Sequence, residues 1–303
     1  MMYKSFALVA MIAAFASRAT AFAPVARRGA MGSLRMAATA EAGEAVDAKI
    51  ATGKVAIVTG SSRGIGRAVA LALGQAGCRV VVNYANSAGP AEEVVEAIKA
   101  MGGGADAVAV KANCAKEEEI KGLFEACEST WGEGVSCDIL VNNAGITRDG
   151  LAVRMSEEQF REVIDTNLVG VFLASREAAN IMLRKRKGRI VNIASVVGQI
   201  GNAGQANYAA AKGGVIAMTM SNAREFAKRG VKVNCVCPGF IKSDMTDELP
   251  ERFVEEVVGT IPLGRFGEVD EVAGMVKFLA TDPAAEYITG HTFNVDGGMA
   301  IGA

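Results

Sequence analysis

The chain has 303 residues, of which 50% are hydrophobic and 21% charged, so it can bury a large core and is not disordered over most of its length. The first 36 residues carry five basic side chains and no acid, which leaves a net charge of −6 on the rest. That acidic balance argues against nucleic acid as the main partner. One histidine and six scattered cysteines without C-x-x-C spacing argue against a metal site and predict reduced thiols in the core.

The amino-terminal segment has the features of a targeting leader. Lys4 precedes an apolar run over residues 6–16, which is too short to span a bilayer, and the small residues Ala19 and Ala21 suit a signal peptidase. An arginine- and alanine-rich stretch without acids follows, and the junction resembles the two-part leaders of algal plastid proteins. We therefore predict a signal peptide over residues 1–21, a plastid transit peptide over 22–40 and a mature protein in the plastid stroma, outside any membrane. A plain secretory signal is the alternative, disfavoured because no disulfide framework follows.

Short apolar runs alternate with amphipathic stretches from Lys54 onward. The predicted strands span residues 55–59, 79–83, 107–111, 139–142, 189–194, 231–237 and 292–295. The predicted helices span residues 65–76, 91–101, 117–131, 157–184, 206–228 and 269–280. Continuous apolar strands separated by helices are typical of a parallel sheet covered on both faces. We expect one doubly wound α/β domain of the Rossmann type over residues 54–303, with about seven parallel strands.

A glycine-rich turn joins the first predicted strand to the first predicted helix. It contains Gly60, Gly64 and Gly66 in the spacing G-x-x-x-G-x-G. Glycines allow a tight turn and close approach of phosphate oxygens, and the start of a helix offers free N–H groups. The order strand, turn and helix therefore predicts a dinucleotide site, the alternative being a glycine-rich connection that binds nothing.

The second strand indicates which dinucleotide is bound. An NAD enzyme places a carboxylate about 20 residues after the glycines, where it bonds the ribose 2′-hydroxyl. The corresponding residues here are Val82, Asn83 and Tyr84, none of them acidic, whereas Arg63 offers a guanidinium to a 2′-phosphate. We predict NADP(H), the alternative being that Arg63 is a solvated surface charge.

Tyr208 and Lys212 lie four residues apart in a predicted helix, so their side chains share one helix face. An ammonium close to the phenol is expected to lower the tyrosine pKa by up to roughly three units, which would make Tyr208 an acid near neutral pH. Ser195 follows the preceding strand at the sheet edge where ligands bind, and Asn167 lies in the helix before it. Taken alone, the tyrosine and lysine could be an ordinary exposed pair.

Together these motifs resemble the short-chain dehydrogenase/reductase family. The resemblance spans residues 54–300 and rests on the glycine turn 59–66, the segment 142–145, the Tyr208-x-x-x-Lys212 pair, and Asn167, Ser195, Pro238 and Gly239. Within the family, the runs 143–149, 204–208 and 296–298 are similar to those of 3-oxoacyl-(acyl-carrier-protein) reductases of plastids and bacteria.

The resemblance implies a role for each catalytic residue. Tyr208 would donate a proton to the substrate carbonyl, and Ser195 would bind that carbonyl and the developing alkoxide. Lys212 would hold the nicotinamide ribose, and Asn167 would anchor a water that relays protons. The implied cofactor contacts are Gly60, Ser61, Ser62, Arg63, Gly64, Ile65, Gly66, Asn83, Asn113, Cys114, Asn143, Ala144, Gly145, Tyr208, Lys212 and Ile241. The loop 240–261 would close over the substrate.

The same resemblance implies NADPH as cofactor, acyl carrier protein as partner and a homotetramer built by pairing the two long helices. Arg186 and Arg229 match positions that meet the acidic carrier. Three other functions stay open: reduction of another ketone, such as a sugar, a steroid or a coenzyme A thioester; an enoyl reductase, disfavoured because its tyrosine-to-lysine spacing is longer; and a nucleotide-binding module without catalysis.

Overall fold

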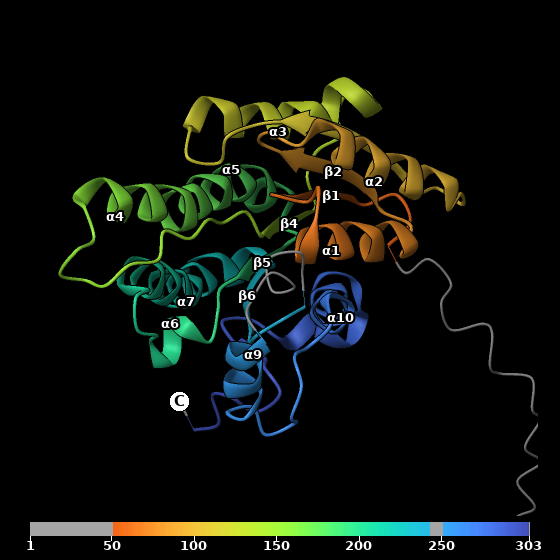
Figure 1. Cartoon of the computed structure of the whole chain (residues 1–303). Helices are drawn as coiled ribbons and strands as arrows, with labels where there is room; N and C mark the ends of the chain where they lie inside the picture. Colours follow the sequence, from red (N-terminus) through yellow and green to blue (C-terminus); the bar gives the residue numbers. More distant parts are fainter. Residues whose placement is uncertain (1–50, 243–250, 303) are drawn as a thin grey trace, which may run out of the picture. The chain divides into compact units, whose positions relative to one another are not determined.

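The computed structural model describes residues 51–242 and 251–302 (Figure 1). The predicted signal and transit peptides, residues 1–21 and 22–40, lie outside the described residues, as do residues 243–250 of the predicted substrate loop. No helix in the described part is long and apolar enough to cross a membrane.

Seven strands form one sheet in the order β3-β2-β1-β4-β5-β6-β7, and every neighbouring pair is parallel. The strands are β1 (Val55–Val58), β2 (Arg79–Tyr84), β3 (Asp106–Lys111), β4 (Ile139–Asn142), β5 (Gly188–Ile193), β6 (Val231–Pro238) and β7 (Thr292–Val295). All seven predicted strands are present, and none of their bounds differs from the prediction by more than one residue.

Helices cover both faces of this sheet (Figure 1). One face carries α1 (Gly64–Gln75), α2 (Ala88–Ala100) and α10 (Val269–Thr281), and the other carries α3 (Glu117–Trp131), α5 (Gly170–Lys185) and α7 (Ala206–Phe226). Successive strand residues alternate between the two cores: Ala56 and Val58 pack with the first set, Val55 and Ile57 with the second. The predicted doubly wound α/β fold is therefore confirmed.

The strand order reverses direction between β1 and β4. The chain runs outward from β1 to β2 and β3, then returns to place β4 on the other side of β1, with Val58 opposite Val141. At such a switch point the loops after the two strands diverge, which opens a crevice at the carboxyl ends of the strands. The glycine turn and the Asn143 segment flank this point.

The helix predicted over residues 157–184 is interrupted. The structure has α4 (Glu157–Ile164), a π-helical turn η1 (Asp165–Val169) and then α5. Two helices were not predicted, α6 (Val197–Ile200) and α9 (Glu251–Val258). Short 3-10 turns, η2 (Ala227–Arg229) and η3 (Pro283–Tyr287), complete the described elements.

Candidate active site

The turn after β1 requires its glycines. Gly60 and Gly64 have φ angles of +60° and +55°, in the left-handed region that favours glycine. A Cβ at Gly66 would lie 2.3 Å from the Gly60 carbonyl oxygen and 2.4 Å from Nδ2 of Asn143. No side chain fits there, so glycine is what lets the start of α1 pack directly against the turn, as in a phosphate-binding turn.

Asn83 holds this turn from within. Its Oδ1 accepts a hydrogen bond from the Gly60 N–H at 2.9 Å, and its Nδ2 donates to the carbonyl oxygen of Ala112 at 3.0 Å. Its main-chain N–H donates to the Ser61 hydroxyl, which in turn donates to the Val58 carbonyl oxygen. Asn83 is 1% exposed. The structure therefore places Asn83, which was predicted to contact the cofactor, beneath the turn, where its hydrogen bonds set the turn's shape.

The other cofactor residues predicted from the first half of the chain differ in exposure. Arg63 is exposed at the start of α1, and its guanidinium makes no hydrogen bond or ion pair with the described part of the chain. Asn113 is exposed too, and its Oδ1 accepts a hydrogen bond from the Ala115 N–H. Cys114 is buried with its sulfur 3.4 Å from Oδ1 of Asn83. Within the described part of the chain, Arg63 and the amide nitrogen of Asn113 are thus available to a ligand.

The segment after β4 is bonded directly to the glycine turn. The main-chain N–H groups of Asn143 and Ala144 donate to the Thr59 hydroxyl at 2.9 and 3.0 Å. Nδ2 of Asn143 donates to the carbonyl oxygens of Thr59 and Gly60, both at 2.9 Å. These bonds fix the predicted ribose-binding segment beside the predicted phosphate turn.

Asn167 is fully buried in the π-helical turn η1. Its Oδ1 accepts from the Ile146 N–H and its Nδ2 donates to the Ile146 carbonyl oxygen, both at 2.8 Å. A Cβ at Gly145 would lie 3.3 Å from Oδ1 of Asn167 and 3.7 Å from the Lys212 ammonium, so both groups border this glycine. The structure brings Asn167 and Lys212 together, with the Asn167 side chain fixing the loop after β4.

Ser195 lies just beyond β5, and its hydroxyl accepts a hydrogen bond from the Val197 N–H at 3.2 Å. The following helix, α6, packs on α7 through Gly198, where a Cβ would lie 2.7 Å from the Lys212 carbonyl carbon and from the Gly213 nitrogen. A Cβ at Gly214 would likewise lie 2.9 Å from Leu168 of η1. These glycines were not among the predicted site residues. The sequence feature that could have revealed them is their position inside helices, because glycine is unfavourable there unless something packs against it.

Burial dominates the electrostatics of the tyrosine and lysine. It raises the pKa of Tyr208 to about 12; a hydrogen bond with Ser195 opposes the rise, and the charges of Asp149 and Cys237 add to it. Burial also lowers the pKa of Lys212 to about 8. The Lys212 ammonium donates to the Ile193 carbonyl oxygen at 2.7 Å and lies 5.5 Å from the centre of the tyrosine ring. The predicted lowering of the Tyr208 pKa is therefore wrong for the protein as described, because desolvation outweighs the hydrogen bond with Ser195.

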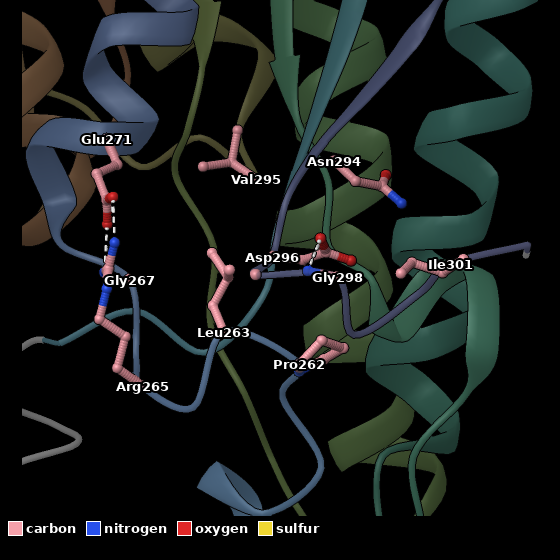
Figure 2. A pocket seen from close by; sticks show the side chains of 11 residues that line it. Pro262, Leu263, Arg265, Gly267, Glu271, Asn294, Val295, Asp296, Gly298 and Ile301 are labelled. Atoms are coloured by element: carbon pink, nitrogen blue, oxygen red, sulfur yellow. Dashed lines mark hydrogen bonds and ion pairs between the residues drawn. The ribbon is translucent and has the colours of Figure 1, made fainter.

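The predicted substrate loop is described in part. Ile241 is buried and pairs with Gly267, while the rings of Phe240 and Phe266 stack with centroids 5.6 Å apart. Beside it, next to the end of β7, lies a hollow of about 440 Å³ (Figure 2). Its rim includes Asp296, and none of the predicted catalytic residues lines it. The hollow is thus separate from the catalytic group.

Arg186 and Arg229 adjoin each other at the opposite edge of the sheet. Arg186 ends α5 with a φ of 56°, and a Cβ at Gly230 would lie 2.5 Å from its carbonyl oxygen. Both arginines precede the amino ends of β5 and β6, whereas Ser195 follows the carboxyl end of β5. A six-residue strand, about 20 Å long, therefore separates them from the catalytic residues of the same chain.

All six cysteines are buried and free, in agreement with the predicted core thiols. In the residues that the structure describes, no group of three histidine, cysteine, aspartate or glutamate side chains could hold a metal ion.

Comparisons with known proteins agree with this geometry. The family model described as Enoyl-(Acyl carrier protein) reductase matches residues 60–300. The 3-oxoacyl-(acyl-carrier-protein) reductase of Synechocystis sp. is 54% identical over 250 residues, which cover 82% of this chain and 98% of the relative. A reductase of the same name from Staphylococcus aureus is 54% identical over 246 residues, 81% of this chain and 98% of the relative.

A crystal structure described as a gluconate dehydrogenase of Agrobacterium tumefaciens has a TM-score of 0.77 and 36% identity, covering 82% of this chain and 96% of that one. The family match, the relatives and the fold lead to the same assignment: the chain belongs to the short-chain dehydrogenase/reductase family.

Proposed function

We propose that this protein reduces 3-oxoacyl-(acyl-carrier-protein) to the 3-hydroxyacyl product in type II fatty acid synthesis, with NADPH as the reductant. The observation that carries this proposal is the convergence of Ser195, Tyr208 and Lys212 next to the segment after β4 that is bonded to the glycine turn. Relatives that are 54% identical and named as 3-oxoacyl-(acyl-carrier-protein) reductases support the substrate.

The residues of the glycine turn fit a dinucleotide. Side chains are excluded at Gly60 and Gly66, and the exposed Arg63 guanidinium is unpaired in the described part of the chain. Arg63 would pair with the 2′-phosphate of NADPH, and the start of α1 would face the pyrophosphate. Asn143, Ala144, Gly145 and the Asn113 amide would hold the ribose and the adenine. When bound, the cofactor supplies the hydride.

Ser195 and Tyr208 would act on the substrate carbonyl. The Ser195 hydroxyl would hold the carbonyl oxygen, and the Tyr208 hydroxyl would give that oxygen its proton. A pKa of about 12 keeps Tyr208 protonated at neutral pH, which is the state that a proton donor needs. The buried Lys212 would orient the phenol and the nicotinamide ribose and pass a proton back to the tyrosine. Because both polar atoms of the Asn167 side chain are bonded to Ile146, we assign the relay water to the Asn167 main-chain carbonyl.

The position of Arg186 and Arg229 bears on how the carrier would dock. They lie across the sheet from Ser195, so a carrier bound there would deliver its acyl chain to the active site of a neighbouring subunit. A homotetramer paired through α4, α5 and α7 provides such a neighbour. Partly exposed apolar side chains on these helices support the pairing: Phe160, Phe172 and Met220 are 39%, 47% and 39% exposed.

The leader supports delivery to the plastid stroma. The test is to express the full chain with a fluorescent carboxyl-terminal fusion in an alga that has such plastids. Fluorescence inside the plastid is expected, and recovery of the processed protein in the medium would contradict this location.

The assay that tests the reaction follows NADPH oxidation by the mature chain with 3-oxoacyl-(acyl-carrier-protein). We expect turnover with this substrate and with a short 3-oxoacyl thioester. The structural likeness to a protein described as a gluconate dehydrogenase makes sugar ketones the main comparison, and the name of the family model adds enoyl thioesters. Faster turnover of either class would overturn the proposed substrate, and no turnover of any of them would favour a module without catalysis.

A further inference from the structure

Asn207 precedes Tyr208 in α7 and is completely buried. Its Oδ1 accepts a hydrogen bond from the Tyr208 main-chain N–H at 2.8 Å. Its Nδ2 donates to the main-chain carbonyl oxygens of Arg148 at 3.0 Å and Gln159 at 3.4 Å. One side chain therefore joins the first turn of α7 to the loop after β4 and to α4.

This arrangement replaces the usual start of a helix. The first four N–H groups of a helix have no partner within it, and a side chain at the residue before the helix commonly bonds one of them. Gln205 occupies that position in α7 and makes no such bond. The Tyr208 N–H is among the four, and it is Asn207 that satisfies it. The direction in which the catalytic side chain leaves the helix thus depends on Asn207.

The loop that holds Asn207 is itself anchored on both sides. The Arg148 guanidinium bonds both carboxylate oxygens of Glu162 in α4, at 2.8 and 2.7 Å. The next residue is held as well, because Nε2 of Gln205 donates to both carboxylate oxygens of Asp149, at 3.2 and 3.0 Å. The Arg148 carbonyl oxygen is therefore a fixed acceptor for Asn207.

We propose that Asn207 is a positioning residue for Tyr208, holding the first turn of α7 so that the phenol is aimed at the carbonyl held by Ser195. This inference rests on the proposed role of Tyr208 as proton donor. The hydrogen bonds of the Asn207 side chain go to Arg148, Gln159 and Tyr208 and not to the turn residues 59–66, so its loss should alter proton transfer and leave cofactor binding intact.

The matched control is Asn234 in β6. It is 1% exposed and likewise bridges main-chain groups, because its Nδ2 donates to the Ile288 carbonyl oxygen at 2.9 Å and its Oδ1 accepts from the His291 N–H at 3.2 Å. Asn207→Ala and Asn234→Ala therefore remove the same chemistry from the same degree of burial. Both should melt several degrees below wild type, roughly the effect of losing a satisfied buried polar group.

Kinetics separate the two variants. For Asn207→Ala, kcat should fall about tenfold or more, the scale of a misplaced catalytic group, while the NADPH dissociation constant stays within about twofold of wild type. For Asn234→Ala, kcat should stay within about twofold. For Asn207→Ser, kcat should lie between the values for wild type and Asn207→Ala, because the serine hydroxyl would lie near the Tyr208 N–H but would be too short to reach the two carbonyl oxygens. This variant keeps the test possible if Asn207→Ala fails to fold. An unchanged kcat in Asn207→Ala, or an equal loss in both alanine variants, overturns the proposal.

Tyr208→Phe in the same assay separates this inference from the function on which it rests. Full turnover in that variant would overturn the proton-donor role itself. A large loss in Tyr208→Phe together with normal turnover in Asn207→Ala would overturn the positioning role alone.

Discussion

The two edges of the sheet at which the strands begin and end, here called the amino edge and the carboxyl edge, are held together in different ways. At the carboxyl edge, neutral buried side chains such as Asn167 and Asn207 bond main-chain atoms, and Lys212 is the one buried cation among the described residues. At the amino edge, charged side chains pair with one another, as the partly buried Arg189 and Lys232 do with the exposed Glu286. Short neutral bonds fix positions to a fraction of an ångström, whereas exposed ion pairs are weak and screened by salt. Function at the carboxyl edge should therefore be sensitive to the loss of single atoms, and function at the amino edge mainly to changes in charge.

The sharpest test of the carboxyl edge removes one oxygen. Tyr208→Phe should lower turnover at least about a hundredfold, the scale of general-acid catalysis. The affinity for NADPH, measured by titration of cofactor fluorescence, should be nearly unchanged, because the ring remains in place. Near-normal turnover would show that another group donates the proton.

Arg63→Ala tests a charge that lies at the carboxyl edge but is exposed. A charge-assisted pair with the 2′-phosphate contributes roughly 1.5–3 kcal/mol, so NADPH should bind about ten- to a hundredfold more weakly. Binding of NADH, which lacks that phosphate, is the control and should change little. Equal weakening of both cofactors would mean that Arg63 does not contact the phosphate.

At the amino edge, Arg186→Glu combined with Arg229→Glu should raise the KM for carrier-bound substrate about tenfold, because each lost pair and new repulsion costs on the order of 1 kcal/mol. A small thioester without the carrier should react as in wild type, since the two arginines lie across the sheet from Ser195. High salt should reduce the difference in this KM between the variant and wild type. An equal loss of activity with both substrates would show that these charges serve folding and not docking of the carrier.

The smallest effect is expected at Glu286. Its bond with Lys232, together with the Arg189 charge, lowers the pKa of this carboxyl group. A lowered carboxyl pKa adds stability above the unfolded value, near 4.3, which is lost as the pH falls toward the folded value. The side chain is 64% exposed, so Glu286→Gln should lower the free energy of unfolding at pH 7 by no more than about 1 kcal/mol. Urea titration at pH 7 and pH 3 measures this, and a difference that grows on acidification would contradict it.

The strands could be predicted because most are short apolar runs rich in valine, isoleucine and alanine, with glycines or polar residues at their ends. The break at Asp165–Val169 could not, because apolar spacing continues through the π-helical turn and hides its one extra residue. The short helix α6 contains only Val197–Ile200, which is too few residues to establish a helical period.

For the site, the sequence was sufficient to name Asn83 and Asn167 but not their partners, and it did not single out Asn207. Asn83, Asn167 and Asn207 bond main-chain atoms more than 20 residues away, and such partners leave no trace in spacing. The pKa of Tyr208 was predicted in the wrong direction because spacing shows the neighbouring lysine and not the burial of both groups. The placement of Arg186 and Arg229 together, away from Ser195, follows only from strand direction.

The π-helical turn also constrains how the sequence can change over evolution. A turn with one extra residue rotates the helix beyond it by about 100° relative to an uninterrupted one. The buried residues of α4 and α5, Val163 in the first and Leu173 and Ala178 among those in the second, therefore reach the core from either side of this turn, with the buried Asn167 between them. Deletion of a single residue here would restore a regular helix, which is locally the more favourable form, and would turn the buried residues of one of the two helices outward. The length of this segment, as much as its composition, is therefore what natural selection must preserve.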